Sequence, residues 1–158
     1  MNYTIGIDLG GTNTRIGLVA EDGKVIEVLK FKTYEHKELN DFVETLSDNI
    51  VLIVQKHNLP KESIKVGIGA PNGNYYAGTI EQAPNLPFKG IVPLVDLLKE
   101  SLKKKSYSAE VVLTNDANAA AMGEKIYGKA KNVRDFVMIT LGTGVGSGIF
   151  VDNKLVYG

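Results

Sequence analysis

The stretch Ile5-Gly6-Ile7-Asp8-Leu9-Gly10-Gly11-Thr12 decides the fold, because its pattern returns 132 positions later as Val137-Met138-Ile139-Thr140-Leu141-Gly142-Thr143-Gly144. With the same shift, Leu18-Val19 lies over Phe150-Val151. Both copies consist of an apolar strand, a glycine turn, a second strand, a tight turn and a third strand. The repeat predicts a complete lobe over residues 1–132 and the opening strands of a second lobe of the same fold over 133–158.

Strands alternate with helices between the two copies. Apolar residues from Leu39 to Val54 recur at helical spacing, and Pro60 prevents that helix from continuing. The segment from Asn72 to Gly90 is rich in proline, glycine and asparagine and predicts a long structured loop or hairpin. Further strands are expected at 64–68 and 110–113, and further helices at 94–102 and 117–127. The order is three antiparallel strands and then αβαβα, which predicts an α/β lobe with a mixed sheet and right-handed crossovers.

Composition excludes several classes of protein. The chain has 158 residues, 44% of them hydrophobic, which is enough for a compact domain. Its 18 basic residues balance 18 acidic ones, so no net charge favours nucleic acid or an anionic membrane. There is no cysteine, and no apolar run approaches the roughly 20 residues that cross a bilayer. We therefore expect a cytoplasmic protein with neither a nucleic-acid nor a membrane partner.

The first glycine turn has the chemistry of a phosphate site. Gly10 and Gly11 let successive backbone N–H groups point at one spot, where phosphate oxygens would fit. Asp8 ends a buried strand and is placed to hold Mg²⁺ through water. Side-chain donors are added by Thr12, Asn13 and Thr14. An ordinary hairpin with a hydrogen-bonded Asp8 is the alternative, but a hairpin does not require two glycines, two threonines and a carboxylate together.

The second glycine turn, Leu141 to Gly148, invites comparison with dinucleotide-binding loops. That fingerprint needs G-x-G-x-x-G between a strand and a helix, whereas here the glycines alternate and Ile149-Phe150-Val151 continues as a strand. A second phosphate-binding hairpin fits better, and the two turns are expected to grip one polyphosphate across a cleft. Its candidate contacts are Gly142, Thr143, Gly144 and Gly146.

Two polar positions suggest chemistry on a sugar. Asn115 and Asp116 lie where a strand meets an alanine-rich helix, so one could cap the helix while its neighbour takes a proton from a sugar hydroxyl. Capping alone is the alternative. Asn85 is held between Pro84 and Pro87, which suits the recognition of a polyol, although simple turn formation explains it equally well.

Together these segments resemble the ROK family of sugar kinases, and within it the bacterial glucokinase type. The matching segments are Asp8 to Arg15, Gly67 to Pro71, Ala83 to Leu86, Asn115 to Ala120 and Leu141 to Gly148. The resemblance implies an actin-like, ribonuclease H-like duplicated fold, with sugar and ATP·Mg bound between two lobes that close. It also implies that Asp116 is the base toward the 6-hydroxyl, that Asn85, Asn115, Gly69 and Pro71 line the sugar site, and that both glycine turns contact ATP phosphates.

The resemblance also has limits. Asn72 stands where the family often has glycine, and the family's Glu-x-Gly-His segment and zinc cluster fall beyond Gly158, so we expect no zinc site in this chain. The expected reaction is ATP-dependent phosphorylation of a hexose, glucose to glucose 6-phosphate, by a protein that is a homo-oligomer in its full-length form. An N-acetylhexosamine or fructose kinase, a sugar-responsive ROK regulator and an inactive piece of a kinase are the alternatives.

Overall fold

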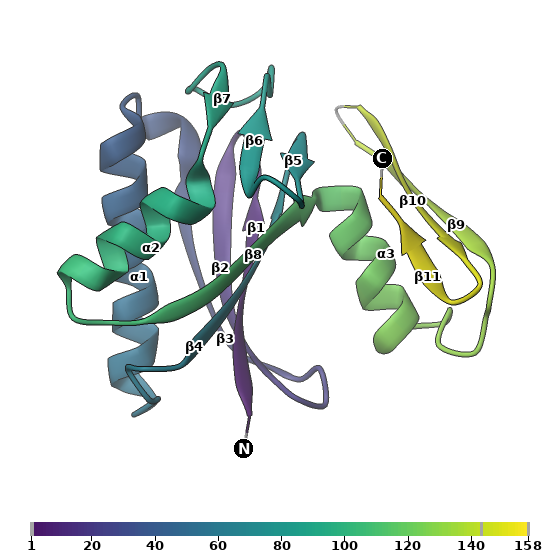
Figure 1. The fold of residues 1–158 in the computed structure, drawn as a ribbon, viewed down its shortest axis with the longest axis horizontal. Helices are drawn as coiled ribbons and strands as arrows, with labels where there is room; N and C mark the ends of the chain where they lie inside the picture. The colour runs from purple at the N-terminus through teal and green to yellow at the C-terminus, as the bar shows by residue number, and fades with distance from the viewer. Residues whose placement is uncertain (1, 143, 158) are drawn as a thin grey trace.

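A five-stranded mixed sheet forms the centre of the computed structural model, which describes residues 2–142 and 144–157. Its strand order is β3-β2-β1-β4-β8, with β1, β2 and β3 antiparallel and β4 and β8 parallel to β1 (Figure 1). The bounds are β1 (Tyr3–Leu9), β2 (Asn13–Ala20), β3 (Val25–Lys32), β4 (Ile64–Ala70) and β8 (Ala109–Asn115). The mixed sheet predicted from the alternation of elements is confirmed.

One face of this sheet is buried under two helices, α1 (Leu39–Lys56) and α2 (Leu94–Lys104). Alternate residues of the strands point to this face, among them Ile7, Leu18 and Val66, and all three are nearly inaccessible to solvent. The apolar stripe of α1 completes the layer, since Phe42 and Leu46 are fully buried. A short 3₁₀ helix, η1 (Thr33–Glu35), joins β3 to α1.

The opposite face of the sheet is open. Gly6, Gly17 and Gly67 lie side by side across β1, β2 and β4, so the middle of this face has no side chains. Val28 of β3 and Val112 of β8 stand at the two edges of the same row, and both are about half exposed. A smooth channel rimmed by valines is the result.

The proline-rich segment is more ordered than the sequence predicts. It contains three short strands, β5 (Gly73–Asn74), β6 (Thr79–Glu81) and β7 (Ile91–Val92), which form a small antiparallel sheet in the order β5-β6-β7. The side-chain oxygen of Asn74 accepts hydrogen bonds from the N–H groups of Tyr76 and Ala77, which closes the hairpin. Strands this short carry no periodic pattern, so the sequence predicts a loop or hairpin in general and not this sheet.

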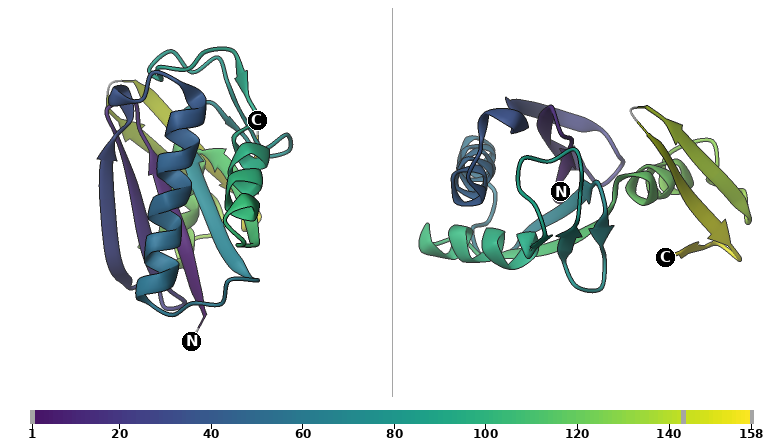
Figure 2. Two further views of the ribbon diagram at one scale, coloured as in Figure 1. Left: turned by 90° about the vertical axis from the view of Figure 1, so that its left-hand side faces the viewer. Right: turned by 90° about the horizontal axis from the view of Figure 1, so that it is seen from above.

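The alanine-rich helix α3 (Asp116–Ile126) lies between the central sheet and a third sheet, which also has three strands (Figure 2). That sheet has the order β11-β10-β9 and is built from β9 (Phe136–Leu141), β10 (Val145–Val151) and β11 (Lys154–Val156). Ala117 and Ala121 of α3 press so closely on Gly148 that a Cβ there would overlap Ala121 and lie 2.8 Å from the Ala117 carbonyl oxygen. Among the described residues, no helix is long and apolar enough to cross a membrane.

The two copies of the repeat form part of the central sheet and the β11-β10-β9 sheet, but they do not align at a constant shift of 132 residues. Gly6 pairs with Gly17, and the equivalent Met138 pairs with Gly148, so Leu18 corresponds to Ile149 and not to Phe150. Four residues join the paired ends of β1 and β2, whereas three join those of β9 and β10. The overlay of Leu18-Val19 on Phe150-Val151 is therefore wrong by one residue, because a comparison at a fixed shift cannot register a shortened turn.

Candidate active site

Four residues at one level of the sheet build the base of the site. Arg15 of β2, Asp8 of β1, Gly69 of β4 and Thr114 of β8 are neighbours in register. They lie near the carboxyl ends of the three parallel strands, where open α/β sheets bind their ligands. Gly69 lets α3 approach closely, since a Cβ there would lie 3.1 Å from the Cβ of Ala119.

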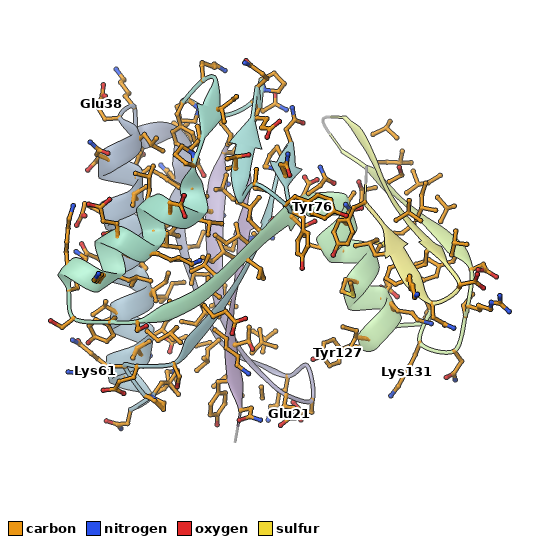
Figure 3. The ribbon with its side chains drawn as sticks, in the orientation of Figure 1. Glu21, Glu38, Lys61, Tyr76, Tyr127 and Lys131 are labelled. Atoms are coloured by element: carbon orange, nitrogen blue, oxygen red, sulfur yellow. The ribbon has the colours of Figure 1, made fainter. Side chains whose placement is uncertain are left out.

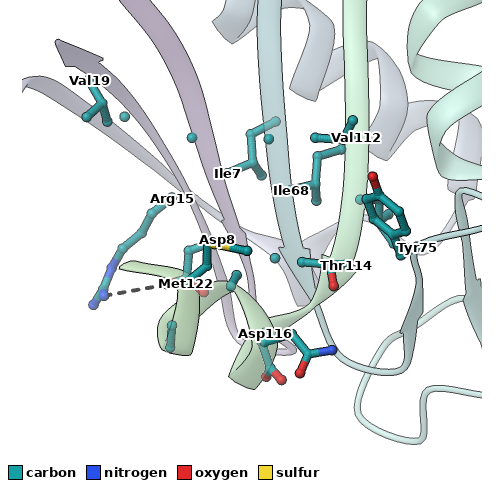
Figure 4. Close-up of a pocket in the computed structure, with 18 of the residues that line it drawn as sticks. Ile7, Asp8, Arg15, Val19, Ile68, Tyr75, Val112, Thr114, Asp116 and Met122 are labelled. Atoms are coloured by element: carbon teal, nitrogen blue, oxygen red, sulfur yellow. Dashed lines mark ion pairs between the residues drawn. The ribbon is translucent and has the colours of Figure 1, made fainter. Parts of the chain in front are cut away.

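A cavity of about 730 Å³ opens over this row and continues along the glycine channel. Asp116 lines the cavity at the start of α3, and Tyr75 lines it from the β5–β6 hairpin (Figure 4). Among the predicted site residues, it thus brings together Asp8, Gly69 and Asp116. At the far end, the hydroxyl of Tyr127, the C-cap of α3, donates a hydrogen bond to the backbone carbonyl of Glu21, so the end of α3 touches the β2–β3 turn (Figure 3).

The Asp8 carboxylate is exposed and is paired only weakly with Arg15. Its Oδ2 lies 3.8 Å from Nη1 of Arg15, and the two side chains are 67% and 60% exposed. An ion pair this open and this long contributes little, so a cation in the cavity could replace Arg15. No group of three or more potential metal-ligating side chains occurs among the described residues. One exposed carboxylate fits a hydrated Mg²⁺, which takes few protein ligands, better than a cation that needs a full protein cage.

Asn115 and Asp116 both bond to the backbone at the start of α3. Asn115 is the N-cap, and its Oδ1 accepts a hydrogen bond of 2.9 Å from the N–H of Ala117. Oδ1 of Asp116 accepts from the same N–H at 2.8 Å, while the residue stays exposed to the cavity. Both side chains thus cap the first turn of α3, and the helix N-terminus also favours the negative charge of Asp116.

The first glycine turn meets the proline-flanked loop directly. A hydrogen bond of 3.0 Å from the N–H of Gly10 to the carbonyl of Asn13 closes the turn. A Cβ on Gly11 would overlap the carbonyl oxygen of Asn85 and lie 3.2 Å from the Asn85 Cβ. The segments predicted for phosphate and for sugar are thus in contact, although Pro71, Asn85 and Asn115 do not line the cavity over Asp8.

Thr14 does not have the role that the sequence predicts for its side chain. It is fully buried, and its hydroxyl lies 2.8 Å from the hydroxyl of Thr33. The prediction of a side-chain donor to phosphate at Thr14 is therefore wrong, because the pleat turns this residue to the core face. Thr12, by contrast, is exposed at the tip of the turn.

The second glycine turn is exposed at the same end of the molecule, since β1 and β9 both end at the top of Figure 1. The N–H of Gly142 donates to the carbonyl of Gly144 at 3.0 Å. Thr143 lies outside the described residues. Gly146 is packed against α3, because a Cβ added there would lie 3.0 Å from the Cβ of Ala117. Protein atoms therefore occupy the space beside it. None of the described residues of either turn lines the 730 Å³ cavity, and the convergence of the turns on one ligand stays a prediction.

Four further residues that line the cavity are not among the predicted site residues: Arg15, Tyr75, Thr114 and Tyr157. The hydroxyl of Thr114 is buried and has no hydrogen-bond partner among the described residues. Tyr75 stacks on Tyr157 with ring centroids 4.5 Å apart, and burial is the main cause that raises the pKa of Tyr157. Arg15 and Thr114 could have been found from strand alternation beside Asp8, but Tyr75 is placed only by tertiary folding.

Comparison with known proteins identifies the family of the chain. The model of the ROK family matches residues 4–158. The chain belongs to the ROK family. It is 36% identical over 155 residues to a glucokinase of Thermotoga maritima, and the match covers 98% of this chain and 46% of that relative. It is also 37% identical over 158 residues to a xylose repressor of Caldicellulosiruptor bescii, which covers 98% of this chain and 38% of the repressor.

A solved ROK structure shares the fold. The ROK family glucokinase from Streptomyces griseus, in complex with glucose and AMPPNP, superposes with a TM-score of 0.75 at 33% identity. The match covers 99% of this chain and 47% of the glucokinase. This ROK chain thus spans less than half the length of the three relatives it is compared with.

Proposed function

We propose that this ROK chain carries part of the site of an ATP-dependent hexose kinase that converts glucose to glucose 6-phosphate. The observation that carries the proposal is the shared cavity of Asp116 and Asp8, two exposed carboxylates delivered by different elements to the carboxyl ends of parallel strands. The similarity to the T. maritima and S. griseus glucokinases supports the same activity.

Asp116 acts as the general base in the proposed reaction. Its carboxylate accepts the proton of the 6-hydroxyl while that oxygen attacks the γ-phosphorus of ATP. The bond from this phosphorus to the bridging oxygen breaks, and ADP leaves with the electron pair. A base of this kind contributes typically about 10²–10⁴-fold to the rate.

The triphosphate is held by the backbone of the glycine turn. The Gly10 N–H closes the turn on the Asn13 carbonyl, so the N–H groups that follow it, from Gly11 to Asn13, would hydrogen-bond the phosphate oxygens, and the side chains of Thr12 and Asn13 add donors. Asp8 would hold Mg²⁺ through water, and the ion would supply charge neutralisation on the triphosphate. The second turn, with Gly142 and Gly144, belongs to the opposite wall of the cleft in this proposal.

The sugar is held on the other side of Asp116. The oxygen of Asn115 caps α3, so its amide NH₂ group is left to donate to a sugar hydroxyl. Asn85 adds a second amide, and Gly69 and Pro71 shape the wall. In this proposal, residues 1–132 form one lobe and 133–158 open the second, and closure of the lobes excludes water from the transfer.

The substitution Asp116→Asn in the full-length protein tests the base. We expect kcat to fall by about 10²–10⁴-fold. Asp96→Asn is the matched control, because Asp96 lies in the first turn of α2 as Asp116 does in α3, but away from the cavity. Coupled detection of ADP gives both rates, and near-normal turnover by Asp116→Asn would refute the role. A panel of glucose, fructose and N-acetylhexosamines then decides the substrate.

A sugar-responsive regulator is the second candidate, because the xylose repressor matches 98% of this chain at 37% identity. A regulator would bind the sugar without transferring phosphate, and its full-length form would retard specific DNA fragments in a gel-shift assay. A cytoplasmic location and a homo-oligomeric full-length form stay predictions for either function.

A further inference from the structure

Thr33 lies behind the first glycine turn and bonds to it twice. Its backbone N–H donates to the carbonyl of Thr12 at 3.0 Å, and its hydroxyl lies 2.8 Å from that of Thr14. Both Thr14 and Thr33 are fully buried. The two hydrogen bonds therefore attach Thr33 to the residues on either side of Asn13.

The first of these bonds fixes the orientation of one peptide unit. A trans peptide is planar, so its C=O and N–H groups point in opposite directions. Because the carbonyl of Thr12 points to Thr33, the N–H of Asn13 points away from it, toward the β1 side of the turn. The Gly10 N–H bond to the Asn13 carbonyl lies on that same side. Thr33 thus sets the direction of a donor in the predicted phosphate-binding concavity.

Thr33 is itself anchored to the core. The N–H of His36 donates to its carbonyl at 3.1 Å and closes η1. The His36 ring packs edge-on against Phe31 at 5.4 Å and Phe42 at 6.1 Å, and Phe42 is fully buried. A displacement of Thr33 would therefore disturb the packing of α1 against the sheet, and this resists movement of the turn.

We infer that Thr33 is a positioning residue for the nucleotide phosphates, one that holds the Thr12–Asn13 peptide with its N–H already directed at the triphosphate. The inference rests on the proposed function. A turn fixed in advance avoids the entropic cost of ordering its peptides when ATP binds. Loss of this order should therefore weaken ATP binding and leave proton transfer unchanged.

Three variants of the full-length protein test this role. Thr33→Val keeps the shape and the N–H but removes the hydroxyl bond to Thr14 that helps to hold this N–H against the Thr12 carbonyl, and it leaves the Thr14 hydroxyl buried without that partner. Thr33→Ser keeps the hydroxyl. Ser101→Ala is the matched control, because Ser101 and Ser47 form another buried hydroxyl pair at 2.8 Å, between α2 and α1 and away from the cavity. We expect Thr33→Val to raise the KM for ATP by about tenfold while kcat stays within about twofold. Thr33→Ser restores the wild-type value, and Ser101→Ala lowers the melting temperature without changing the KM.

Amide hydrogen exchange provides a readout that needs no catalysis. In Thr33→Val, exchange at residues 10–14 should accelerate by about tenfold, while exchange at Gly6 and Gly17 stays unchanged. If the wild-type protein does not bind AMPPNP at all, the proposed function fails. The hydrogen-exchange measurement still decides whether Thr33 orders the turn. Unchanged exchange in Thr33→Val, or an equal rise in KM for ATP in Ser101→Ala, would overturn the inference.

Discussion

Gly11→Ala tests the contact between the two predicted substrate segments. The added methyl group would overlap the carbonyl oxygen of Asn85 and lie 3.2 Å from its carbonyl carbon and its Cβ. The obstacle is backbone of a proline-flanked loop, so it cannot rotate away as a flexible side chain would. Overpacking of this kind costs about 1–3 kcal/mol. If the loop moves to relieve it, the same energy appears as lost glucose affinity, about 5- to 150-fold.

Calorimetric titration of the full-length protein with glucose and with AMPPNP measures this effect, and thermal unfolding measures the share taken by stability. Gly123→Ala is the matched control, because Gly123 does not line the cavity and no atom outside its neighbours and its own helix backbone lies within 4 Å of the added Cβ. We expect Gly123→Ala to bind both ligands like the wild type. If Gly11→Ala binds glucose with unchanged affinity and unfolds at the wild-type temperature, the turn and the Asn85 loop do not touch in solution and the reasoning is wrong.

Three further predictions concern other contacts. Hydrogen bonds from Lys56 and His57 lower the pKa of Glu27, so the stability that this carboxylate gives is present above its ordinary pKa of 4.5 and is lost as the pH falls through its lower folded-state value. Thermal unfolding between pH 3 and pH 8 should therefore show Glu27→Gln less stable than the wild type at pH 7 and indistinguishable from it at the acid end. Gly148→Val should separate α3 from β10 and cost about 1–3 kcal/mol in urea unfolding, whereas an unchanged midpoint would contradict the close packing. Asp8→Asn should raise the Mg²⁺ concentration needed for half-maximal kinase activity, and an unchanged Mg²⁺ dependence would exclude Asp8 from the metal site.

Sequence patterns determined the order and type of the main elements. Period-two alternation in 5–9 and helical spacing from Leu39 identify a buried sheet face and the helix that covers it, because burial on one side requires that spacing whatever the neighbours are. The glycine turns and the Asn115-Asp116 junction were recognisable for the same reason, since local backbone chemistry limits which residues can occupy them.

Only the tertiary structure decided which of these residues meet. The core position of Thr14, the Tyr75 wall of the cavity and the one-residue register shift between the repeats depend on contacts between segments far apart in the chain. A local pattern fixes which way a side chain leaves its own strand or helix, but its neighbours are set by strand pairing and by turn length. Asp8, Gly69 and Asp116 share one cavity because parallel pairing of β1, β4 and β8 brings the ends of these strands to the same edge of the sheet.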